Sequence, residues 1–233
     1  MNIHTIILAG GKGTRMLSQK AKVLQALGGR TMLNHVLTTA NKISNKISVV
    51  VGFDKEGVEE EIKKIGINAN TYLQKEQIGT ADAVKTTLKD IDKNEKILIL
   101  YGDVPLIKEE TLKKLCNQES DLSILTTNLE NPTGYGRALK DKENNVLGII
   151  EEKDADLEQK KIKEIFTGIL VTKGGLLKNF IPEIENNNSA KEFYLTDLIG
   201  IAHKNGFKIN TLSSLNEETA GANNRIEQEE LEK

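Results

Sequence analysis

Residues 5–15 read TIILAGGKGTR, and this stretch decides the fold class. Five apolar or β-branched residues run directly into a turn that holds three glycines, a lysine and an arginine. Continuous apolar runs of this length are typical of strands covered on both faces of a parallel sheet. Backbone N–H groups in a glycine-rich turn at the end of such a strand can approach phosphate oxygens closely. The stretch therefore predicts a buried strand that leads into a phosphate-binding loop.

Further short apolar runs alternate with helical patterns along the chain. The expected strands cover residues 5–9, 47–51, 97–101, 122–126, 146–150 and 165–171. Apolar side chains recur at helical spacing over residues 32–43, 58–65, 81–91 and 195–202. This alternation predicts one α/β domain with a mainly parallel sheet flanked by helices. A small insertion is expected between about residues 130 and 170, with the charged stretch 151–164 as a loop or exposed helix.

Composition excludes several classes of protein. The 233 residues are 38% apolar and 28% charged, with a net charge of −2, which rules out a broadly basic nucleic-acid binder. The single cysteine, Cys116, can form neither an intramolecular disulfide nor a multi-cysteine zinc site, and we expect it in the core. The apolar runs are too short for a membrane helix, and no secretion signal is visible. We therefore expect a cytoplasmic protein.

Charge is unevenly distributed along the chain. The first 53 residues hold seven lysines or arginines and no acidic residue, and all 34 Asp and Glu follow from Asp54 onward. A basic lobe on an acidic protein suits a small polyanion. Uneven surface charge alone would be the alternative explanation.

The glycine turn matches neither common nucleotide fingerprint. The Walker pattern G-x-x-x-x-G-K-[ST] is absent. The dinucleotide fingerprint needs a glycine where Met16 stands and an acidic residue about 20 positions on, whereas the first acidic residue is Asp54. NAD and FAD are therefore not expected as ligands.

Six segments carry a resemblance to a known family. They are LAGGKGTRM (8–16), KVL (22–24), LQKEQIGTA (73–81), LYGDVPL (100–106), NPTGYGR (131–137) and GANNR (221–225). In this order they resemble the nucleotide-sugar pyrophosphorylases, which are nucleotidyltransferases with a Rossmann-like α/β fold. The best-matching subtype is the uridylyltransferase domain of bacterial bifunctional N-acetylglucosamine-1-phosphate uridylyltransferase/glucosamine-1-phosphate acetyltransferases. The resemblance extends over about residues 3–226.

The resemblance implies roles for particular residues. Arg15, Lys22 and Asp103 would be catalytic, with Asp103 and Asn223 holding Mg²⁺. The nucleotide would contact Leu8, Ala9, Gly10, Gly11, Lys12, Gly13, Gln74, Gly79 and Thr80. The sugar would contact Tyr101, Gly102, Gly136, Glu151, Phe166 and Asn223.

Several of these assignments also follow from residue chemistry. The Gln74 amide offers a donor and an acceptor to a uracil edge, and Thr80 could cap a following helix. Asp103 directly follows an apolar strand, and ligands bind at the carboxyl ends of strands in open α/β sheets. Lys22 can reach phosphates as a point charge; as a surface residue it should add little to stability. Ala21 stands where the family usually has proline, which should loosen the turn.

The implied reaction joins UTP to N-acetylglucosamine 1-phosphate, giving UDP-N-acetylglucosamine and pyrophosphate. A pyrophosphorylase for another sugar or base, or a non-catalytic nucleotide-sugar-binding module, are the alternatives. No nucleic acid, membrane or protein partner is expected. Residues 1–226 would form the nucleotidyltransferase domain and residues 227–233 an acidic helical tail. No hexapeptide repeats are present, so the acetyltransferase β-helix and its activity are not expected.

Phe166 departs from the family pattern. The matching position normally carries an asparagine that hydrogen-bonds the bound nucleotide-sugar, and phenylalanine cannot form that bond. Its ring could instead pack on the sugar, or turn into the protein core. We predict that Phe166 borders the ligand and weakens the binding of UDP-N-acetylglucosamine.

Overall fold

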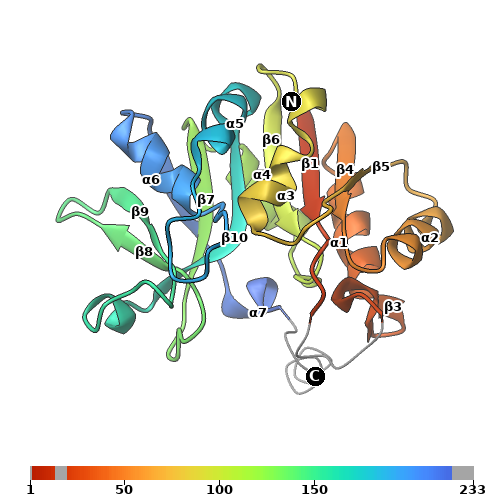
Figure 1. The fold of residues 1–233 in the computed structure, drawn as a ribbon, viewed down its shortest axis with the longest axis horizontal. Coiled ribbons are helices and arrows are strands. Elements are labelled where there is room, and N and C mark those ends of the chain that lie inside the picture. Colours follow the sequence, from red (N-terminus) through yellow and green to blue (C-terminus); the bar gives the residue numbers. More distant parts are fainter. Residues whose placement is uncertain (1, 14–19, 222–233) are drawn as a thin grey trace.

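The computed structural model describes residues 2–13 and 20–221, and it has one central sheet with helices on both faces (Figure 1). In the described chain the strands of this sheet are β1 (Ile3–Leu8), β4 (Lys46–Val51), β5 (Asn70–Leu73), β6 (Lys96–Tyr101), β7 (Leu122–Asn128), β8 (Arg137–Lys140), β9 (Val146–Ile150), β10 (Glu164–Lys173) and β11 (Ile209–Ser213). Two further strands, β2 (Ala26–Leu27) and β3 (Arg30–Thr31), form a separate small hairpin.

The sheet is mainly parallel. Its order is β11-β7-β10-β6-β1-β4-β5, with β8 and β9 attached at β10. β1 runs parallel to β4 and β6, and β4 and β7 run parallel to β5 and β11 respectively. β10 is antiparallel to both β6 and β7. The expected α/β class with a mostly parallel sheet is thus confirmed.

Helices cover the two faces of the sheet and divide the core. The helices are α1 (Met32–Asn41), α2 (Lys55–Ile65), α3 (Thr80–Lys85), α4 (Glu109–Cys116), α5 (Gly174–Phe180), α6 (Asp197–Lys204) and α7 (Asn216–Thr219). Successive side chains of a strand point to opposite faces. Accordingly Ile6 packs with α3, α5 and α6, whereas Ile7 packs with α1, α2 and α4. Cys116 is 1% exposed in the second of these clusters, as expected.

The expected helix over residues 81–91 is wrong in its second half. α3 ends at Lys85 and is followed by a 3₁₀ turn at Leu88–Asp90. The hydroxyls of Thr86 and Thr87 donate to the carbonyls of Ala83 and Val84. Such local bonds compete with the helical ladder, which explains the early end.

Three strands of the sheet were not predicted from the sequence. β5 and β11 are the two edges of the sheet and are only partly buried, so they lack a continuous apolar run. β8 pairs with β9 as a hairpin that projects from β10. Residues 151–163 form a loop with one 3₁₀ turn, Gln159–Lys161. The expected acidic helical tail, residues 227–233, lies outside the described residues, which end at Gly221 after the short helix α7.

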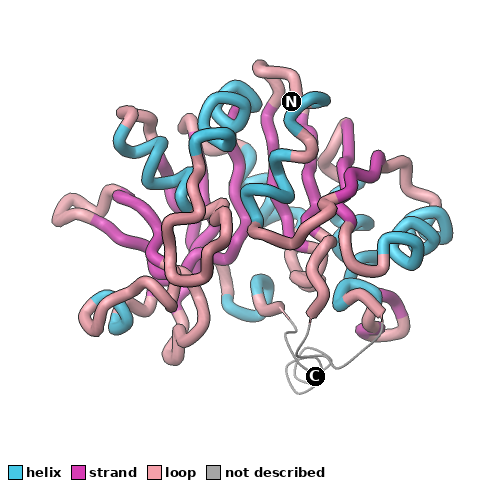
Figure 2. The backbone as a smooth tube through the Cα atoms, viewed as in Figure 1, coloured by secondary structure: helices cyan, strands magenta, loops and turns pink. Residues whose placement is uncertain are grey.

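Loops gather where the parallel strands end. Figure 2 shows the chain leaving β1 as a loop at the lower edge of the sheet, the edge at which β6 also ends. Leu8 pairs with Tyr101 there, so the glycine turn after β1 lies beside the Gly102–Asp103 turn after β6. This strand register brings together two motifs that are about 90 residues apart in sequence.

Candidate functional site

Two adjoining pockets of about 330 Å³ each open at the carboxyl ends of β1 and β6. The first, here the loop pocket, is lined by Leu8, Ala9, Gly10, Gly11, Gly13, Lys22, Val23, Gln74, Gln77, Gly79, Thr80, Ala83, Tyr101, Asp103 and Glu192. The second, here the hairpin pocket, is lined by Thr80, Tyr101, Asp103, Val104, Gly134, Tyr135, Gly136, Glu151, Phe166, Thr167, Gly168, Glu192, Tyr194, Thr196, Thr219 and Gly221. A larger hollow, of about 580 Å³, lies by the edge strand β5 and shares no lining residue with them.

The glycine turn forms one wall of the loop pocket. Gly10 accepts a hydrogen bond from the Phe53 N–H at 3.1 Å, and a Cβ on it would lie 3.3 Å from Gln74 Oε1. Gly13 has a φ of +59°, and a Cβ there would meet the Lys22 side chain at 2.6 Å. Glycine is needed here because the turn packs directly against neighbouring residues. Lys12 does not line the pocket; its amino group lies 5.6 Å from the centre of the Phe53 ring.

Lys22 and Asp103 form an ion pair between Nζ and Oδ2 at the floor of the site. Their side chains are 11% and 23% exposed. Lys22 is therefore not the surface residue expected from the sequence, because its stem is buried behind the glycine turn. The Ala21 N–H donates to Asp54 Oδ2 at 3.0 Å, a bond that proline could not make. The turn thus has a support of its own in place of the family's proline.

Gln74, Gly79 and Thr80 meet at the opening of α3. Gln74 is 5% exposed, and its amide nitrogen donates to the Gly79 carbonyl at 2.9 Å and to Asp82 Oδ2 at 3.0 Å. Gly79 has a φ of +137°, and a Cβ on it would lie 2.3 Å from the Phe193 carbonyl oxygen. No larger residue fits this turn without displacing the backbone around Phe193.

The expected capping role of Thr80 is wrong. Gly79 occupies the N-cap position of α3, and no side chain forms a cap hydrogen bond there. The Thr80 hydroxyl instead accepts a hydrogen bond from the Leu195 N–H at 2.9 Å. The hydroxyl therefore ties α3 to the segment before α6, which contributes Glu192, Tyr194 and Thr196 to the pockets.

Tyr101, at the end of β6, lines both pockets. Burial raises the pKa of its phenol well above the ordinary value, so the hydroxyl stays protonated at neutral pH. Gly168, with a φ of +88°, lies against the ring, and a Cβ there would lie 2.6 Å from Tyr101 Cε2. Gly102 does not line either pocket; its N–H donates to the Leu8 carbonyl at 2.9 Å and joins the two strand ends.

Glu151 and Gly136 face each other in the hairpin pocket. Burial raises the pKa of the Glu151 carboxyl above 4.5, and Oε1 accepts a hydrogen bond from the Thr196 hydroxyl at 2.9 Å. A Cβ on Gly136 would lie 2.7 Å from Ile149 Cγ2 and 3.5 Å from Glu151. The glycine lets the backbone of the 131–136 loop approach the carboxylate.

Phe166 both joins the core and lines the hairpin pocket. It is 5% exposed and packs in the cluster with α5 and α6, yet it is also part of the pocket wall. Its N–H donates to the Gly136 carbonyl at 2.9 Å, and the β10–β7 register shifts directly after it. The contact of Phe166 with a ligand remains a prediction.

Two predicted site residues, Arg15 and Asn223, lie outside the described residues. The neighbouring Gly221 is described: it lines the hairpin pocket, and a Cβ on it would lie 3.2 Å from the Asp103 carbonyl oxygen. Every other predicted residue except Lys12 and Gly102 lines one of the two pockets.

Sequence reasoning missed several lining residues, some of them next to predicted ones and some in the segment before α6. Among them are Gln77, Glu192, Tyr194, Thr196 and Gly168. The polar residues in EFYLT (192–196), directly before a predicted helix, were the available signal. Within the described residues no three His, Cys, Asp or Glu side chains gather as a ready metal cage.

Comparison with known proteins adds independent information. A family model described as "MobA-like NTP transferase domain" matches residues 5–155. The chain is 43% identical over 235 aligned residues to "Bifunctional protein GlmU" of Ruthia magnifica subsp. Calyptogena magnifica, which covers 100% of this chain and 51% of that protein. The chain thus spans about half the length of the curated relative it matches.

A solved structure shares the fold. It is reported as a glucose-1-phosphate thymidylyltransferase from Bacillus anthracis in complex with sucrose, and it superposes with a TM-score of 0.79 at 18% identity. The match covers 99% of this chain and 94% of that one. Among the described residues, no helix has both the length and the apolar character to cross a membrane.

Proposed function

The chain belongs to the MobA-like NTP transferase family, and from this premise we propose that it transfers a uridylyl group from UTP to N-acetylglucosamine 1-phosphate. The products would be UDP-N-acetylglucosamine and pyrophosphate. The observation that carries the proposal is the Lys22–Asp103 pair, which lies where a phosphate loop and a second polar pocket meet. The whole-chain similarity to the bifunctional relative supports the choice of substrates.

The loop pocket suits the triphosphate. Its wall offers the backbone of Gly10–Gly13 to phosphate oxygens and the cation of Lys22 at its floor. Gln74, whose amide orders the Gly79 turn, and Gln77 are the polar side chains that could face a uracil edge. Its partners leave the Gln74 side chain in a fixed orientation, which favours selective recognition.

The hairpin pocket suits the sugar. Glu151 and the backbone of Gly136 provide polar groups for sugar hydroxyls, and Tyr101 and Phe166 provide apolar faces for the ring or an acetamido methyl group. Because Asp103 and Tyr101 line both pockets, the sugar's phosphate would reach the α-phosphate at this boundary.

The chemical step needs positioning and charge stabilisation rather than a nucleophilic side chain. A phosphate oxygen of the sugar 1-phosphate attacks the α-phosphorus of UTP, and the bond to the β-phosphate bridging oxygen breaks as pyrophosphate leaves. Lys22 offsets the charge that grows on that oxygen, and the resemblance assigns the same role to Arg15. The rest of the rate acceleration comes from holding the attacking oxygen, the α-phosphorus and the leaving oxygen in line.

The residues fit a Mg²⁺ ion that is shared with the substrate. Mg²⁺ prefers one or two carboxylates together with substrate phosphates, and the partly exposed Asp103 side chain provides such a carboxylate at the pocket boundary. Asn223 would add an amide oxygen, as the resemblance implies. When bound, the ion would neutralise phosphate charge and orient the reactants.

The test is pyrophosphate release measured over a matrix of four nucleoside triphosphates and several sugar 1-phosphates. UTP with N-acetylglucosamine 1-phosphate should give the highest kcat/KM. A clear preference for another pair would support a pyrophosphorylase of different specificity. Release from no pair, with nucleotide-sugar still bound, would support a non-catalytic binding module.

A further inference from the structure

Arg137 is a buried cation for which the proposed reaction has no use. It is 1% exposed at the start of β8, directly after the loop that forms one wall of the hairpin pocket. Taking a guanidinium out of water costs much free energy unless it is paired and hydrogen-bonded. The Nε of Arg137 has no hydrogen-bond partner among the described residues, so even its present surroundings satisfy it incompletely.

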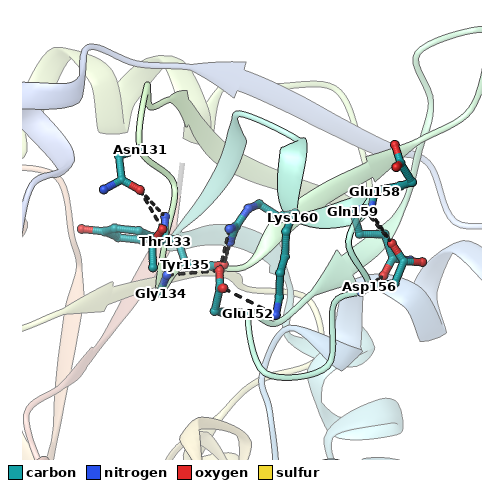
Figure 3. Close-up of polar contacts among 10 residues, drawn as sticks. Asn131, Thr133, Gly134, Tyr135, Glu152, Asp156, Glu158, Gln159 and Lys160 are labelled. Carbon is teal, nitrogen blue, oxygen red and sulfur yellow. Dashed lines mark hydrogen bonds and ion pairs between the residues drawn. The ribbon is translucent and has the colours of Figure 1, made fainter.

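The partners of Arg137 belong to the pocket wall and to the residue after Glu151. One guanidinium nitrogen donates to the Tyr135 carbonyl, and the other donates to Glu152 Oε2 at 2.5 Å. The same Oε2 accepts a hydrogen bond from the Gly134 N–H at 3.2 Å. Figure 3 shows Glu152 between Gly134 and Lys160, whose amino group lies 3.9 Å from Oε1.

These bonds add to the loop's own turn, in which the Tyr135 N–H donates to the Pro132 carbonyl at 3.2 Å and the Thr133 hydroxyl donates to Asn131 Oδ1 at 2.7 Å. Gly134 and Gly136 have no side chains, and Gly134 has a φ of +89° with open space around its missing Cβ. The loop is held at the Gly134 N–H, the Tyr135 carbonyl and the Gly136 carbonyl, the last bonded by Phe166. The first two of these anchors depend on the Arg137–Glu152 pair.

The pair also links the Gly134–Gly136 loop to the segment that carries Glu151. Glu152 follows Glu151, whose carboxylate would lie 3.5 Å from a Cβ on Gly136. Arg137 pairs in register with Ile150 of β9 and Ile165 of β10, so its backbone joins the two strands that lead to Glu151 and Phe166. The guanidinium lowers the pKa of the Glu152 carboxyl, which therefore stays ionised at neutral pH.

We propose that the Arg137–Glu152 pair is a positioning device that sets the Gly134–Gly136 backbone against the sugar and so determines affinity for the sugar 1-phosphate without affecting UTP. This inference rests on the proposed function. Arg137 is buried, whereas the Glu152 side chain is 26% exposed. Stability alone would be served as well by an apolar pair of similar volume, since an ion pair with a buried member is often no more stabilising than its apolar replacement. The directional bonds to Gly134 and Tyr135 are what an apolar pair could not supply.

The experiment measures kcat, both KM values and the thermal unfolding midpoint for Glu152→Gln, Arg137→Met and the double variant Arg137→Met/Glu152→Leu. A matched control comes from the same strand: Lys140 forms an ion pair with Glu164 at 2.7 Å, and neither residue lines a pocket. Glu164→Gln therefore removes a comparable charge pair without touching the loop. Pyrophosphate release with UTP and N-acetylglucosamine 1-phosphate is the assay.

We expect Glu152→Gln and Arg137→Met to raise the KM for the sugar 1-phosphate at least about fivefold, with less than about twofold change for UTP. The double variant should regain most of the lost thermal stability while its sugar KM stays raised, because the buried charge is gone but the backbone anchors are not restored. Glu164→Gln should leave both KM values within about twofold of wild type.

Other outcomes overturn the inference. The pair would be purely structural if both KM values changed equally or if neither changed. It would also be purely structural if the double variant recovered its affinity for the sugar 1-phosphate together with its stability. A wild type that releases no pyrophosphate from any substrate pair would instead overturn the proposed function, and this inference with it. The activity of the wild type therefore separates the two failures.

Discussion

The imidazole of His4 and the carboxylate of Glu95 lie 2.9 Å apart, Nδ1 to Oε1, with the histidine fully buried at the start of β1. The other ring nitrogen lies 2.7 Å from the Ser48 hydroxyl on β4. This polar cluster is in the sheet interior, away from both pockets, and none of its members lines them. It bears on stability rather than on catalysis.

Stability should fall with acid because of His4. Burial, opposed by Glu95, lowers the pKa of His4 below 6.5. As the pH falls, the His4 imidazole is protonated in the unfolded chain before it is protonated in the native state. The free energy of unfolding is therefore highest above about pH 6.5 and decreases below it. The limiting slope for one proton is about 1.4 kcal/mol per pH unit.

Urea denaturation between pH 5 and 8 tests this contribution. His4→Gln should flatten the slope below about pH 6.5, whereas the exposed His203, replaced by Gln, should leave it unchanged. Identical slopes in His4→Gln and wild type would show that His4 does not carry the pH dependence.

Asp103→Asn should lower kcat at least about a hundredfold, the scale of losing a major electrostatic stabiliser. The change also removes the carboxylate that would share a Mg²⁺ ion with substrate. Asp121→Asn is the control, since Asp121 pairs with Lys173 at 3.1 Å outside both pockets. Near-wild-type turnover by Asp103→Asn would show that this carboxylate takes no part in the reaction.

Lys22→Met should raise the KM for UTP and lower kcat while keeping most of the buried stem. Because Lys22 is buried and paired, the change leaves Asp103 without its cation and should also cost stability, on the order of 1–3 kcal/mol. Kinetics and urea denaturation on the same sample separate these effects. A stable variant with unchanged kinetics would show that Lys22 does not contact the phosphates.

Gly79→Ala should disrupt the nucleotide pocket. The added methyl would lie 2.3 Å from the Phe193 carbonyl oxygen, and the φ of +137° is unfavourable for alanine. Gly66→Ala is the control: its φ is +75°, but nothing lies within 4 Å of the new Cβ. Only Gly79→Ala should raise the KM for UTP, by about tenfold or more, in the pyrophosphate assay.

Phe166→Asn should lower the KM for N-acetylglucosamine 1-phosphate, because the amide restores a hydrogen bond worth about 0.5–1.5 kcal/mol. Phe166 is also a core residue, so the variant should be less stable than wild type. Phe166→Leu, which stays apolar, controls for the loss of packing. If Phe166→Asn and Phe166→Leu have the same affinity for N-acetylglucosamine 1-phosphate and the same sugar preference, Phe166 does not select the ligand.

Local sequence was enough to predict the fold class and the glycine turn of the loop pocket. The run from Thr5 to Gly13 carries the apolar pattern of a strand and a glycine turn within a few residues, so both elements could be recognised without the rest of the chain. Asp103 could be recognised in the same way, because it lies two residues after the end of β6. Edge strands such as β5 were missed because partial exposure removes the apolar run by which strands are recognised.

Only the tertiary structure decided which residues line the same wall of a pocket. Thr80 bonds Leu195 across 115 positions, and Lys22 meets Asp103 across 81. Such contacts follow from the order of the strands, which periodicity does not encode. The burial of Arg137 is of the same kind: in the sequence it is one arginine after a turn, and only the packing of β8, β9 and β10 around it leaves Glu152 as its partner. The chain's own pattern sets the local elements, whereas burial and pairing between distant elements set the site, because their free energies arise only when the sheet is assembled.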